Sequence, residues 1–221
     1  MKVVGLVPIK LNNERMPNKN ILPFDGGKPL ISYILDTLIS IKKIDDIYVY
    51  CSSKEIKKFL PKGVSFLQRD PVLDLATTPF NKILTSFAEK VYSDIYVLTH
   101  ATAPFITAKS IEFGIEMVIG GEYDSALAVT KLNEFIWKNG KPFNYDIENI
   151  PRTQDLEPIY KETCGLYVYN RELITQKGRR IGDKPFLVEV SKIEAIDIND
   201  ADDFALANAI FQSKFKEKMA L

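Results

Sequence analysis

Short apolar runs alternate along this chain with longer segments in which apolar residues recur at helical spacing. The apolar runs predict strands at 3–8, 46–53, 64–68, 95–98 and 125–131. The helical spacing predicts helices at 28–41, 54–60, 77–91 and 107–119. Later in the chain we predict short strands at 167–169 and 186–190, a short helix from near residue 170, and a last helix at about 200–214. This alternation predicts an α/β fold with a mostly parallel sheet covered on both faces.

Two of the predicted helices begin with residues that are typical of helix starts. Thr77, Thr78 and Pro79 open the helix at 77–91, which predicts a threonine cap with proline in the first turn. Acidic residues open the last helix, where they are expected to cap it and to oppose its positive end: Asp200, Asp202 and Asp203.

The segment 132–161 departs from the alternation. Its aromatic residues and prolines are scattered among polar residues without a sustained period, and an excursion of about thirty residues is too long for an ordinary connection. A floppy β-hairpin insertion is one interpretation. The aromatic residues have no helical or strand face on which their own domain could bury them: Phe135, Trp137, Phe143 and Tyr145. We therefore expect a homodimer in which a partner covers them.

Length and charge narrow the class of protein. A chain of 221 residues fits one large domain, 1–221. Lys plus Arg equal Asp plus Glu at 29 each, so there is no basic field of the kind that binds nucleic acid. Cys51 and Cys164 lack the spacing of a metal site or a disulfide framework, and no apolar run suits a secretory leader or a membrane span. We expect a cytoplasmic protein with no membrane partner.

The first predicted strand leads into a polar loop with three cations. Lys10, Arg15 and Lys19 follow the carboxyl end of an apolar strand, which is where parallel sheets bind ligands. Cations so placed suit the phosphates of a nucleoside triphosphate. The loop has neither the glycine-lysine-serine/threonine run of a P-loop nor a G-x-G-x-x-G pattern. An exposed basic loop without a ligand is the alternative.

This loop resembles the first motif of the cytidylyltransferases that activate acidic sugars, the acylneuraminate and 3-deoxy-octulosonate group. The matching residues are Pro8, Arg15, Pro17, Lys19 and Asn20. Lys10 stands where the family has arginine, and Asn13 where it has serine. The resemblance implies a Rossmann-like, three-layer α/β/α nucleotidyltransferase fold. It also implies that the three cations hold the triphosphate of CTP, and that residues around them contact the substrate: Pro8, Leu11, Asn12 and Asn20.

Two later strand ends extend the resemblance. In the family, an arginine-proline pair and an acidic-threonine stretch follow the strand that corresponds to 64–68, which implies that Arg69 and Thr77 contact the nucleotide. An ion pair of Arg69 with Asp70 or Asp74 is the alternative. After the strand at 95–98 the sialate branch reads Q-P-T-S-P, so Thr102 matches and His100 replaces glutamine. His100 is the single histidine, and we expect it to contact the acceptor or to accept a proton, with a spectator role as the alternative.

The most specific match is the stretch from Ile150 to Gly165. It resembles the family block R-x-Q-D-L-P-x-x-Y-x-E-N-G-A, except that its last three residues are Thr163-Cys164-Gly165. The resemblance assigns Arg152, Gln154 and Glu162 to the acceptor, and it gives the segment 132–161 the role of a dimerisation arm that reaches over the partner's sugar site. An ion pair between subunits is the alternative for Arg152 and Glu162.

A final acidic segment completes the resemblance. The family reads I-D-I-D-T-P-E-D-F, and its aspartates hold Mg²⁺ on the triphosphate; here Asp197 is retained and Asn199 takes the second position. Mg²⁺ needs only one or two protein oxygens when phosphates and water supply the rest, so Asp197 with the Asn199 carbonyl could suffice. The loss of one formal charge should weaken the site.

The resemblance as a whole implies transfer of CMP from CTP to a sugar acceptor, with release of pyrophosphate and with Mg²⁺ as cofactor. An acidic sugar would give a CMP-sugar for a surface glycan. The departures from the motifs keep two alternatives open. One is a sugar-phosphate or polyol-phosphate acceptor, which would give a CDP-linked product. The other, suggested by Asn199, is an inactive homologue that binds the nucleotide as a regulator.

Overall fold

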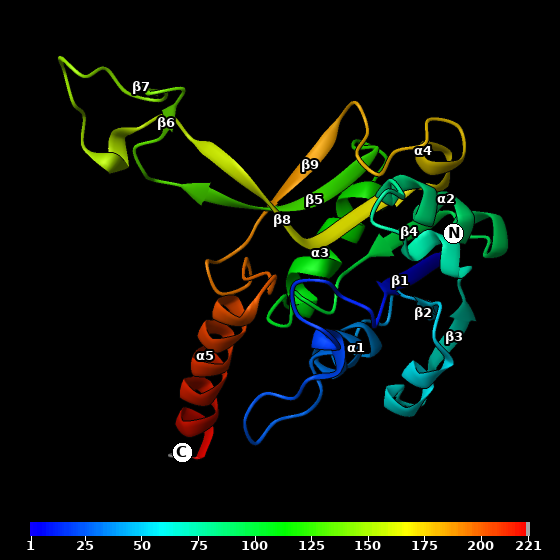
Figure 1. Ribbon diagram of the computed structural model, residues 1–221. Coiled ribbons are helices and arrows are strands. Elements are labelled where there is room, and N and C mark those ends of the chain that lie inside the picture. The colour runs from blue at the N-terminus through cyan, green and yellow to red at the C-terminus, as the bar shows by residue number, and fades with distance from the viewer. Residues whose placement is uncertain (220–221) are drawn as a thin grey trace.

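A seven-stranded sheet forms the centre of the protein, as the computed structural model shows (Figure 1). The structure describes residues 1–219 and the side chains of residues 1–213. The strand order is β3-β2-β1-β4-β8-β5-β9. The strands are β1 (Val3–Ile9), β2 (Asp46–Cys51), β3 (Val64–Gln68), β4 (Ile95–Leu98), β5 (Ser125–Leu132), β8 (Ile159–Asn170) and β9 (Pro185–Glu189). β8 alone runs antiparallel to its neighbours, so the predicted mostly parallel sheet is confirmed.

Helices cover both faces of the sheet, as the sequence predicts. The helices are α1 (Leu30–Ile39), α2 (Phe80–Lys90), α3 (Ala108–Ile119), α4 (Arg171–Thr175) and α5 (Ala201–Met219). Ile34 of α1 and Ile115 of α3 belong to one apolar cluster with the sheet, and Phe87 of α2 and Leu173 of α4 belong to another. Both clusters are buried because each helix turns one apolar stripe to the sheet. No helix within residues 1–219 has the length and apolar character needed to cross a bilayer.

The starts of α3 and α2 differ in how they are capped. Thr107 caps α3 as a helix-start threonine does, since its Oγ1 accepts a hydrogen bond from the amide of Ser110 at 3.2 Å. The threonine cap predicted for α2 is wrong. Pro79 occupies the cap position without a side-chain bond, because the Thr78 hydroxyl donates instead to the carbonyl of Val72 at 3.1 Å. The helix therefore begins at Phe80, after the proline.

β8 is much longer than the strand predicted at 167–169. Its inner half, Leu166–Tyr169, is buried, but its outer half has polar, partly exposed residues without an apolar run, which hid it from the hydrophobic pattern. The outer half pairs with β5, whose Val129 is opposite Glu162. Residues 159–161 and Leu132, which we predicted to be part of the aperiodic arm, thus belong to a long two-stranded ribbon.

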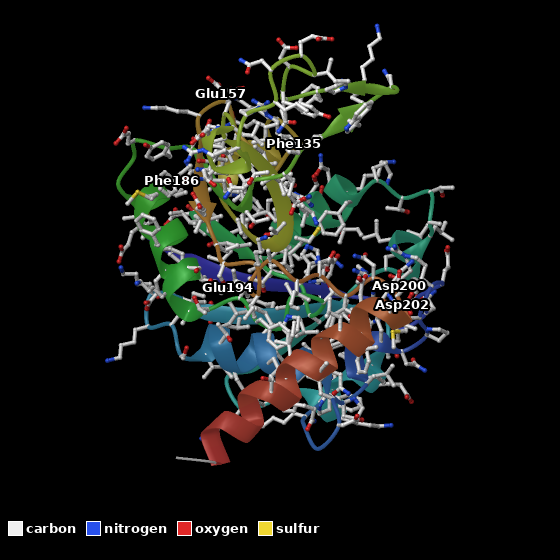
Figure 2. All side chains as sticks on the ribbon, turned by 90° about the vertical axis from the view of Figure 1, so that its left-hand side faces the viewer. Phe135, Glu157, Phe186, Glu194, Asp200 and Asp202 are labelled. Atoms are coloured by element: carbon white, nitrogen blue, oxygen red, sulfur yellow. The ribbon has the colours of Figure 1, made fainter. Side chains whose placement is uncertain are left out.

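The arm, here defined as residues 133–158, extends from the end of this ribbon (Figure 1). It contains the small hairpin β6 (Trp137–Lys138) and β7 (Lys141–Pro142). Asn139 and Gly140 between these strands both have positive φ, 53° and 76°, as a tight type I′ turn requires. Figure 2 shows Phe135 and Glu157 on this arm, well separated from the start of α5.

A small aromatic cluster packs α5, and the segment before it, against Phe24. Phe24 is buried, and its ring centroid lies 5.3 Å from that of Phe204 and 5.2 Å from that of Phe211 on α5. Ile198, which precedes α5, is buried in the same cluster. The segment that contains Asp197 and Asn199 is therefore held against the loop that follows β1.

Glu194 fixes the other end of this segment. Its carboxylate accepts hydrogen bonds from the hydroxyls of Thr107 and Ser110, both at 2.7 Å, and from the Ser191 hydroxyl at 3.0 Å. Burial opposes ionisation, but these donors outweigh it and lower the pKa of Glu194. Figure 2 labels Glu194 near the amino end of α3.

Candidate functional site

The candidate site lies beyond the carboxyl ends of β1 and β4, which are parallel neighbours. The chain passes from β1 to β2 on one side, whereas β4 lies on the other side of β1, so the strand order reverses here. Open α/β sheets bind ligands at such a crevice. The loop after β1 supplies residues 10–18, and the loop after β4 supplies residues 99–103.

The loop after β1 surrounds a hollow of about 210 Å³. The hollow is lined by Lys10, Asn13, Glu14, Arg15, Met16, Lys19 and Ala76. Asn20 is buried and holds the loop closed, because its amide donates to the Lys10 carbonyl at 2.9 Å. Leu11 accepts from the amide of Asn18 at 3.2 Å through its carbonyl, whereas Asn12 is exposed. The structure thus brings the three predicted cations to one hollow.

Lys19 is not an open phosphate ligand in this structure. Its side chain is buried, and its ammonium donates to the carbonyls of Ile198 at 2.8 Å and Asn199 at 3.3 Å. Burial lowers the pKa of Lys19, while the charge of Asp197 opposes this shift. Lys19 therefore joins the loop after β1 to the segment that contains Asp197, and one of its three N–H groups is left for a ligand.

Arg15, Asn199 and Asp197 form a chain of hydrogen bonds beside that hollow. Arg15 donates to Asn199 Oδ1 at 2.9 Å, and Asn199 Nδ2 donates to Asp197 Oδ2 at 3.1 Å. The Asn199 side-chain carbonyl predicted to bind a metal thus accepts a hydrogen bond from Arg15. Asp197 keeps carboxylate lone pairs for a cation. Among the expected capping residues, Asp200 accepts from the amide of Asp203 at 3.1 Å at the start of α5.

A second hollow, of about 240 Å³, adjoins the first and shares Lys10 and Ala76 with it. Its lining is Pro8, Lys10, Arg69, Leu73, Asp74, Leu75, Ala76, Thr78, Phe80 and Ile83. Arg69 lies in its wall with a side chain only 3% exposed, and it pairs with Asp74 while donating to the Ile9 carbonyl at 2.8 Å. The ion pair considered as the alternative for Arg69 is present. Thr77 is exposed, and the hollow is lined by Thr78 instead.

His100 and Thr102 lie in the loop after β4. The His100 ring packs on Phe80, with ring centroids 5.4 Å apart. Burial, followed by the charge of Arg180, lowers the pKa of His100 to about 4, so the ring is neutral at pH 7. Thr102 acts through its backbone, since its carbonyl accepts from the amide of Ile198 at 2.8 Å and so anchors the segment with Asp197.

Arg180 joins this group of residues, although the sequence did not point to it. It comes from the loop between α4 and β9, and its guanidinium lies 3.9 Å from the ring centroid of Tyr167 and 3.6 Å from Glu162 Oε1. Glu162 accepts a hydrogen bond from the Tyr167 hydroxyl. From the sequence we expect ligand-binding residues after the carboxyl ends of strands. Arg180 precedes a strand, so this rule does not select it.

Arg152 and Gln154 do not reach the site of their own chain. Both belong to the arm, where Gln154 is exposed and Arg152 pairs with Asp155 at 2.7 Å. Of the three residues assigned to the acceptor from that block, Glu162 alone among the described residues lies beside Arg180, whose charge acts on the His100 ring.

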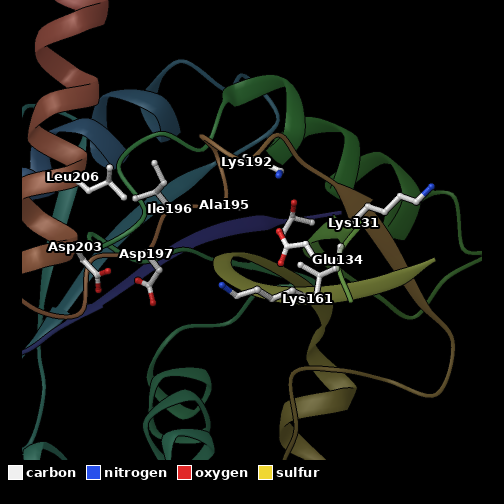
Figure 3. Close-up of a pocket in the computed structure, with 11 residues that line it drawn as sticks. Lys131, Glu134, Lys161, Lys192, Ala195, Ile196, Asp197, Asp203 and Leu206 are labelled. Atoms are coloured by element: carbon white, nitrogen blue, oxygen red, sulfur yellow. The ribbon is translucent and has the colours of Figure 1, made fainter. Parts of the chain in front are cut away.

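A third hollow, of about 470 Å³, includes Asp197 in its wall. It is lined by Thr130, Lys131, Leu132, Glu134, Lys161, Lys192, Ala195, Ile196, Asp197, Asp203 and Leu206. Figure 3 shows Asp197 and Asp203 at one end of it, and Lys131, Glu134 and Lys161 at the other. Asp197 thus belongs to a lysine-bearing hollow and is linked through Asn199 to the cation-rich loop.

Comparison with known proteins agrees with this geometry. A family model described as cytidylyltransferase matches residues 4–209. N-acylneuraminate cytidylyltransferase of Streptococcus agalactiae serotype III (strain NEM316) is 22% identical over 99% of this chain, which spans 56% of that protein. CMP-N,N'-diacetyllegionaminic acid synthase of Legionella pneumophila is 25% identical, over 96% of this chain and 97% of its own length. The chain therefore spans only about half the length of the streptococcal relative.

Solved structures show the same fold. The structure of CMP:2-keto-3-deoxy-manno-octonic acid synthetase complexed with CTP has a TM-score of 0.72 at 13% identity, over 97% of this chain and 100% of that one. That of 4-diphosphocytidyl-2C-methyl-D-erythritol synthase from Anaerococcus prevotii has a TM-score of 0.70 at 15% identity, over 96% of each chain. The predicted nucleotidyltransferase fold is confirmed, and with a family model matching nearly the whole chain, this protein belongs to the cytidylyltransferase family.

Proposed function

We propose that the protein transfers CMP from CTP to an acidic sugar, releasing pyrophosphate and forming a CMP-sugar for a surface glycan. The observation that carries this proposal is the joining of two segments far apart in sequence. Lys19 and Arg15, from the loop after β1, donate hydrogen bonds to residues 198–199, so the cation-bearing loop and the Asp197 carboxylate meet at one crevice. The family and the named relatives support the reaction type.

CTP would occupy the two adjoining hollows. The hollow with Arg69 suits the nucleoside, since it is walled by Pro8, Leu73, Phe80 and Ile83 and contains the buried Arg69–Asp74 pair. The hollow with Lys10 and Arg15 suits the triphosphate. Arg15 is exposed, and among the described residues its hydrogen-bond acceptor is a neutral amide, so it can turn from Asn199 to a phosphate, where a charge-assisted bond is stronger.

The donor set fits Mg²⁺, which we propose as the cofactor. Asp197 offers a hard carboxylate oxygen beside the phosphate loop, and Asn199 offers an amide oxygen once Arg15 has turned away. Bound there, Mg²⁺ would neutralise charge on the triphosphate. Among the side chains of residues 1–213, no group of three or more His, Cys, Asp or Glu is placed to hold a metal ion.

The chain's own residues would position the reaction. An acceptor oxygen attacks the α-phosphorus, the bond to the β-phosphate oxygen breaks, and pyrophosphate leaves with its charge on Lys10 and Arg15. His100 is neutral, and a pKa of about 4 makes it a weak proton acceptor. We therefore assign it a hydrogen-bonding contact with the acceptor, and the hydroxyl proton leaves to solvent.

The test is incubation with CTP, Mg²⁺ and a panel of acidic sugars and sugar phosphates, reading pyrophosphate release and product mass. We expect a CMP-sugar from an acidic sugar. A CDP-linked product from a sugar phosphate would replace that acceptor assignment. CTP binding without turnover of any acceptor would indicate a nucleotide-binding homologue instead of an enzyme.

The same assay tests the choice of nucleotide. We expect at least about tenfold faster turnover with CTP than with ATP or GTP, because membership of the cytidylyltransferase family implies a pocket sized for a pyrimidine. The measurement is initial pyrophosphate release at equal nucleotide concentrations. Equal turnover with a purine triphosphate would contradict the assignment.

A further inference from the structure

Arg180 is a half-buried cation held in a fixed position by aromatic rings. Its guanidinium carbon lies 3.9 Å from the ring centroid of Tyr167 and 5.0 Å from that of Phe80, and its side chain is 22% exposed. Stacking on two rings restricts the rotamers of a long side chain before any ligand binds. The guanidinium is therefore preorganised.

The hydrogen-bonding capacity of Arg180 is unused. Among the described residues its polar contact is Glu162 Oε1 at 3.6 Å, which is longer than a hydrogen bond, and that carboxylate already accepts from the Tyr167 hydroxyl. Other arginines at comparable depth are satisfied. Arg69 bonds to Asp74 and to the Ile9 carbonyl, and Arg171 bonds to the Ala88 carbonyl and the Tyr96 hydroxyl. A partly desolvated fork without partners is costly unless a ligand supplies them.

Arg180 also lies beside the reacting groups but outside the nucleotide hollows. It lines neither the hollow with Arg15 nor the one with Arg69. Phe80 forms part of the second hollow and packs on both His100 and Arg180, so the arginine is in the layer next to the nucleoside. The charges of Arg180 and Asp197 both act on the His100 ring, so both groups lie in the neighbourhood of that ring.

We propose that Arg180 determines acceptor specificity by binding an anionic group of the acceptor, a carboxylate or a phosphate, through its two-pronged guanidinium. Both anions present paired oxygens that match the fork. The inference rests on the proposed function and adds that the acceptor must be charged at the position next to Tyr167. Glu162 Oε1 lies 3.6 Å from the guanidinium without a hydrogen bond to it, so the carboxylate attracts the guanidinium but leaves its N–H groups to the acceptor.

Steady-state kinetics of Arg180→Gln test this inference, with the acceptor varied at saturating CTP and CTP varied at saturating acceptor. We expect the acceptor KM to rise by about tenfold or more, with the CTP KM changed less than twofold. The matched control is Arg179→Gln, the same change one residue earlier, because Arg179 is a surface residue that pairs with Asp183. An unchanged acceptor KM, or a rise in the CTP KM instead, would overturn the inference.

A second comparison identifies the anion. With an acidic sugar acceptor, the wild type should discriminate against its uncharged methyl ester, and Arg180→Gln should not. With a sugar phosphate acceptor, whose phosphate is also the attacking group, the comparison is made by binding: the wild type should bind the sugar phosphate more tightly than the dephosphorylated sugar, and Arg180→Gln should not. Discrimination that persists in Arg180→Gln would reject the assignment.

Binding measured without CTP separates this inference from the proposed function. If no acceptor is turned over, the proposed reaction fails, but N-acetylneuraminate and glucose 1-phosphate can still be tested for binding by ligand-observed NMR. We expect the wild type and Arg179→Gln to bind one of them and Arg180→Gln to lose it; binding retained by Arg180→Gln, or none by the wild type, overturns the inference. If Arg180→Gln does not fold by circular dichroism, Arg180→Lys keeps the charge without the fork and should still raise the acceptor KM or Kd.

Discussion

At the scale of single residues, Lys19 has a different role from the one its position in the sequence suggests. It is a buried cross-link to the carbonyls of Ile198 and Asn199, whereas Arg15 is an exposed cation bound to one amide. The same loop thus contains one cation that builds the site and one that is free to turn to a ligand. Substitution should separate the two roles.

We expect Arg15→Ala and Lys19→Ala each to lower kcat/KM at least about tenfold, because one charge-assisted contact is worth about 1.5–3 kcal/mol. Lys19→Ala should also lower the free energy of unfolding by about 1–3 kcal/mol, since it leaves buried carbonyls without donors. Arg15→Ala should leave stability within about 0.5 kcal/mol. Steady-state kinetics measure kcat/KM, and urea denaturation measures the free energy of unfolding. Lys28→Ala, at an exposed position, is the control. Wild-type rates in both variants would show that this loop is not the phosphate site.

His100 gives a prediction about pH. Its pKa is lowered from 6.5 to about 4 by burial and by Arg180, so below pH 6.5 the unfolded chain takes up a proton that the folded chain does not. Stability therefore falls as the pH drops from 6.5 towards 4, by up to about 3 kcal/mol at 1.36 kcal/mol per pKa unit. His100→Gln should lose less stability over this range.

The measurement is urea denaturation of the wild type and His100→Gln at several pH values without added Mg²⁺. His100→Gln removes the single histidine of the 221 residues, and the carboxyl groups that titrate in this range are the same in both proteins. Parallel curves for the two proteins would mean that His100 titrates normally in the folded state.

At the scale of elements, the segment between β9 and α5 forms the proposed metal site. Ile198 is buried under α5, the Thr102 carbonyl holds its amide, and Asn199 donates to Asp203 at 2.8 Å. These contacts fix the backbone on both sides of Asp197, so its carboxylate is placed by the packing of a helix and two loops.

A Mg²⁺ titration of two variants with CTP saturating tests this segment. Asp197→Ala should abolish activity at any practical Mg²⁺ concentration, because it removes the one carboxylate beside the phosphate loop that is proposed to bind the metal. Asn199→Asp should lower the Mg²⁺ concentration for half-maximal rate, since it adds a negative charge near the cation. An active Asp197→Ala enzyme with unchanged metal dependence would place the metal elsewhere.

At the scale of the whole molecule, the arm is a segment whose aromatic side chains are only partly covered by the rest of the chain. Phe135 and Tyr145 pack with their rings tilted and their ring centroids 4.5 Å apart, but Trp137 and Phe143 remain 55% and 56% exposed. The arm also contains Arg152 and Gln154, which resemble family residues yet lie away from the site of their own chain. A second copy would cover the aromatic rings and could bring these two residues to its own crevice.

Light scattering at micromolar concentration tests this arrangement. We expect twice the mass of the 25.1 kDa chain. Trp137→Gln combined with Phe143→Gln should shift the protein towards the monomer, because the exposed apolar surface of the arm is reduced. Ile39→Gln, at an exposed apolar position at the end of α1, should not. A monomeric wild type would reject the dimer.

The amino-acid sequence alone predicts those strands and helices whose apolar pattern is local. Strand β1 and helix α1 are each recognisable from a few neighbouring residues, because a buried strand is continuously apolar and a covering helix repeats every three to four residues. The parallel arrangement then placed the loops after β1 and β4 at one edge of the sheet. Motif resemblance added the family, which the comparisons confirm.

Strand pairing and side-chain contacts between residues far apart in the chain became visible only in the tertiary structure. The outer half of β8 is a strand because β5 pairs with it, and its own residues show no apolar run. Lys19 is a cross-link because Ile198 packs beside it, and Arg180 faces the site because Tyr167 and Phe80 hold it there. Periodicity and spacing report which residues are buried along one element, but a hydrogen bond or an ion pair between distant segments exists only once the packed core has brought their backbones together.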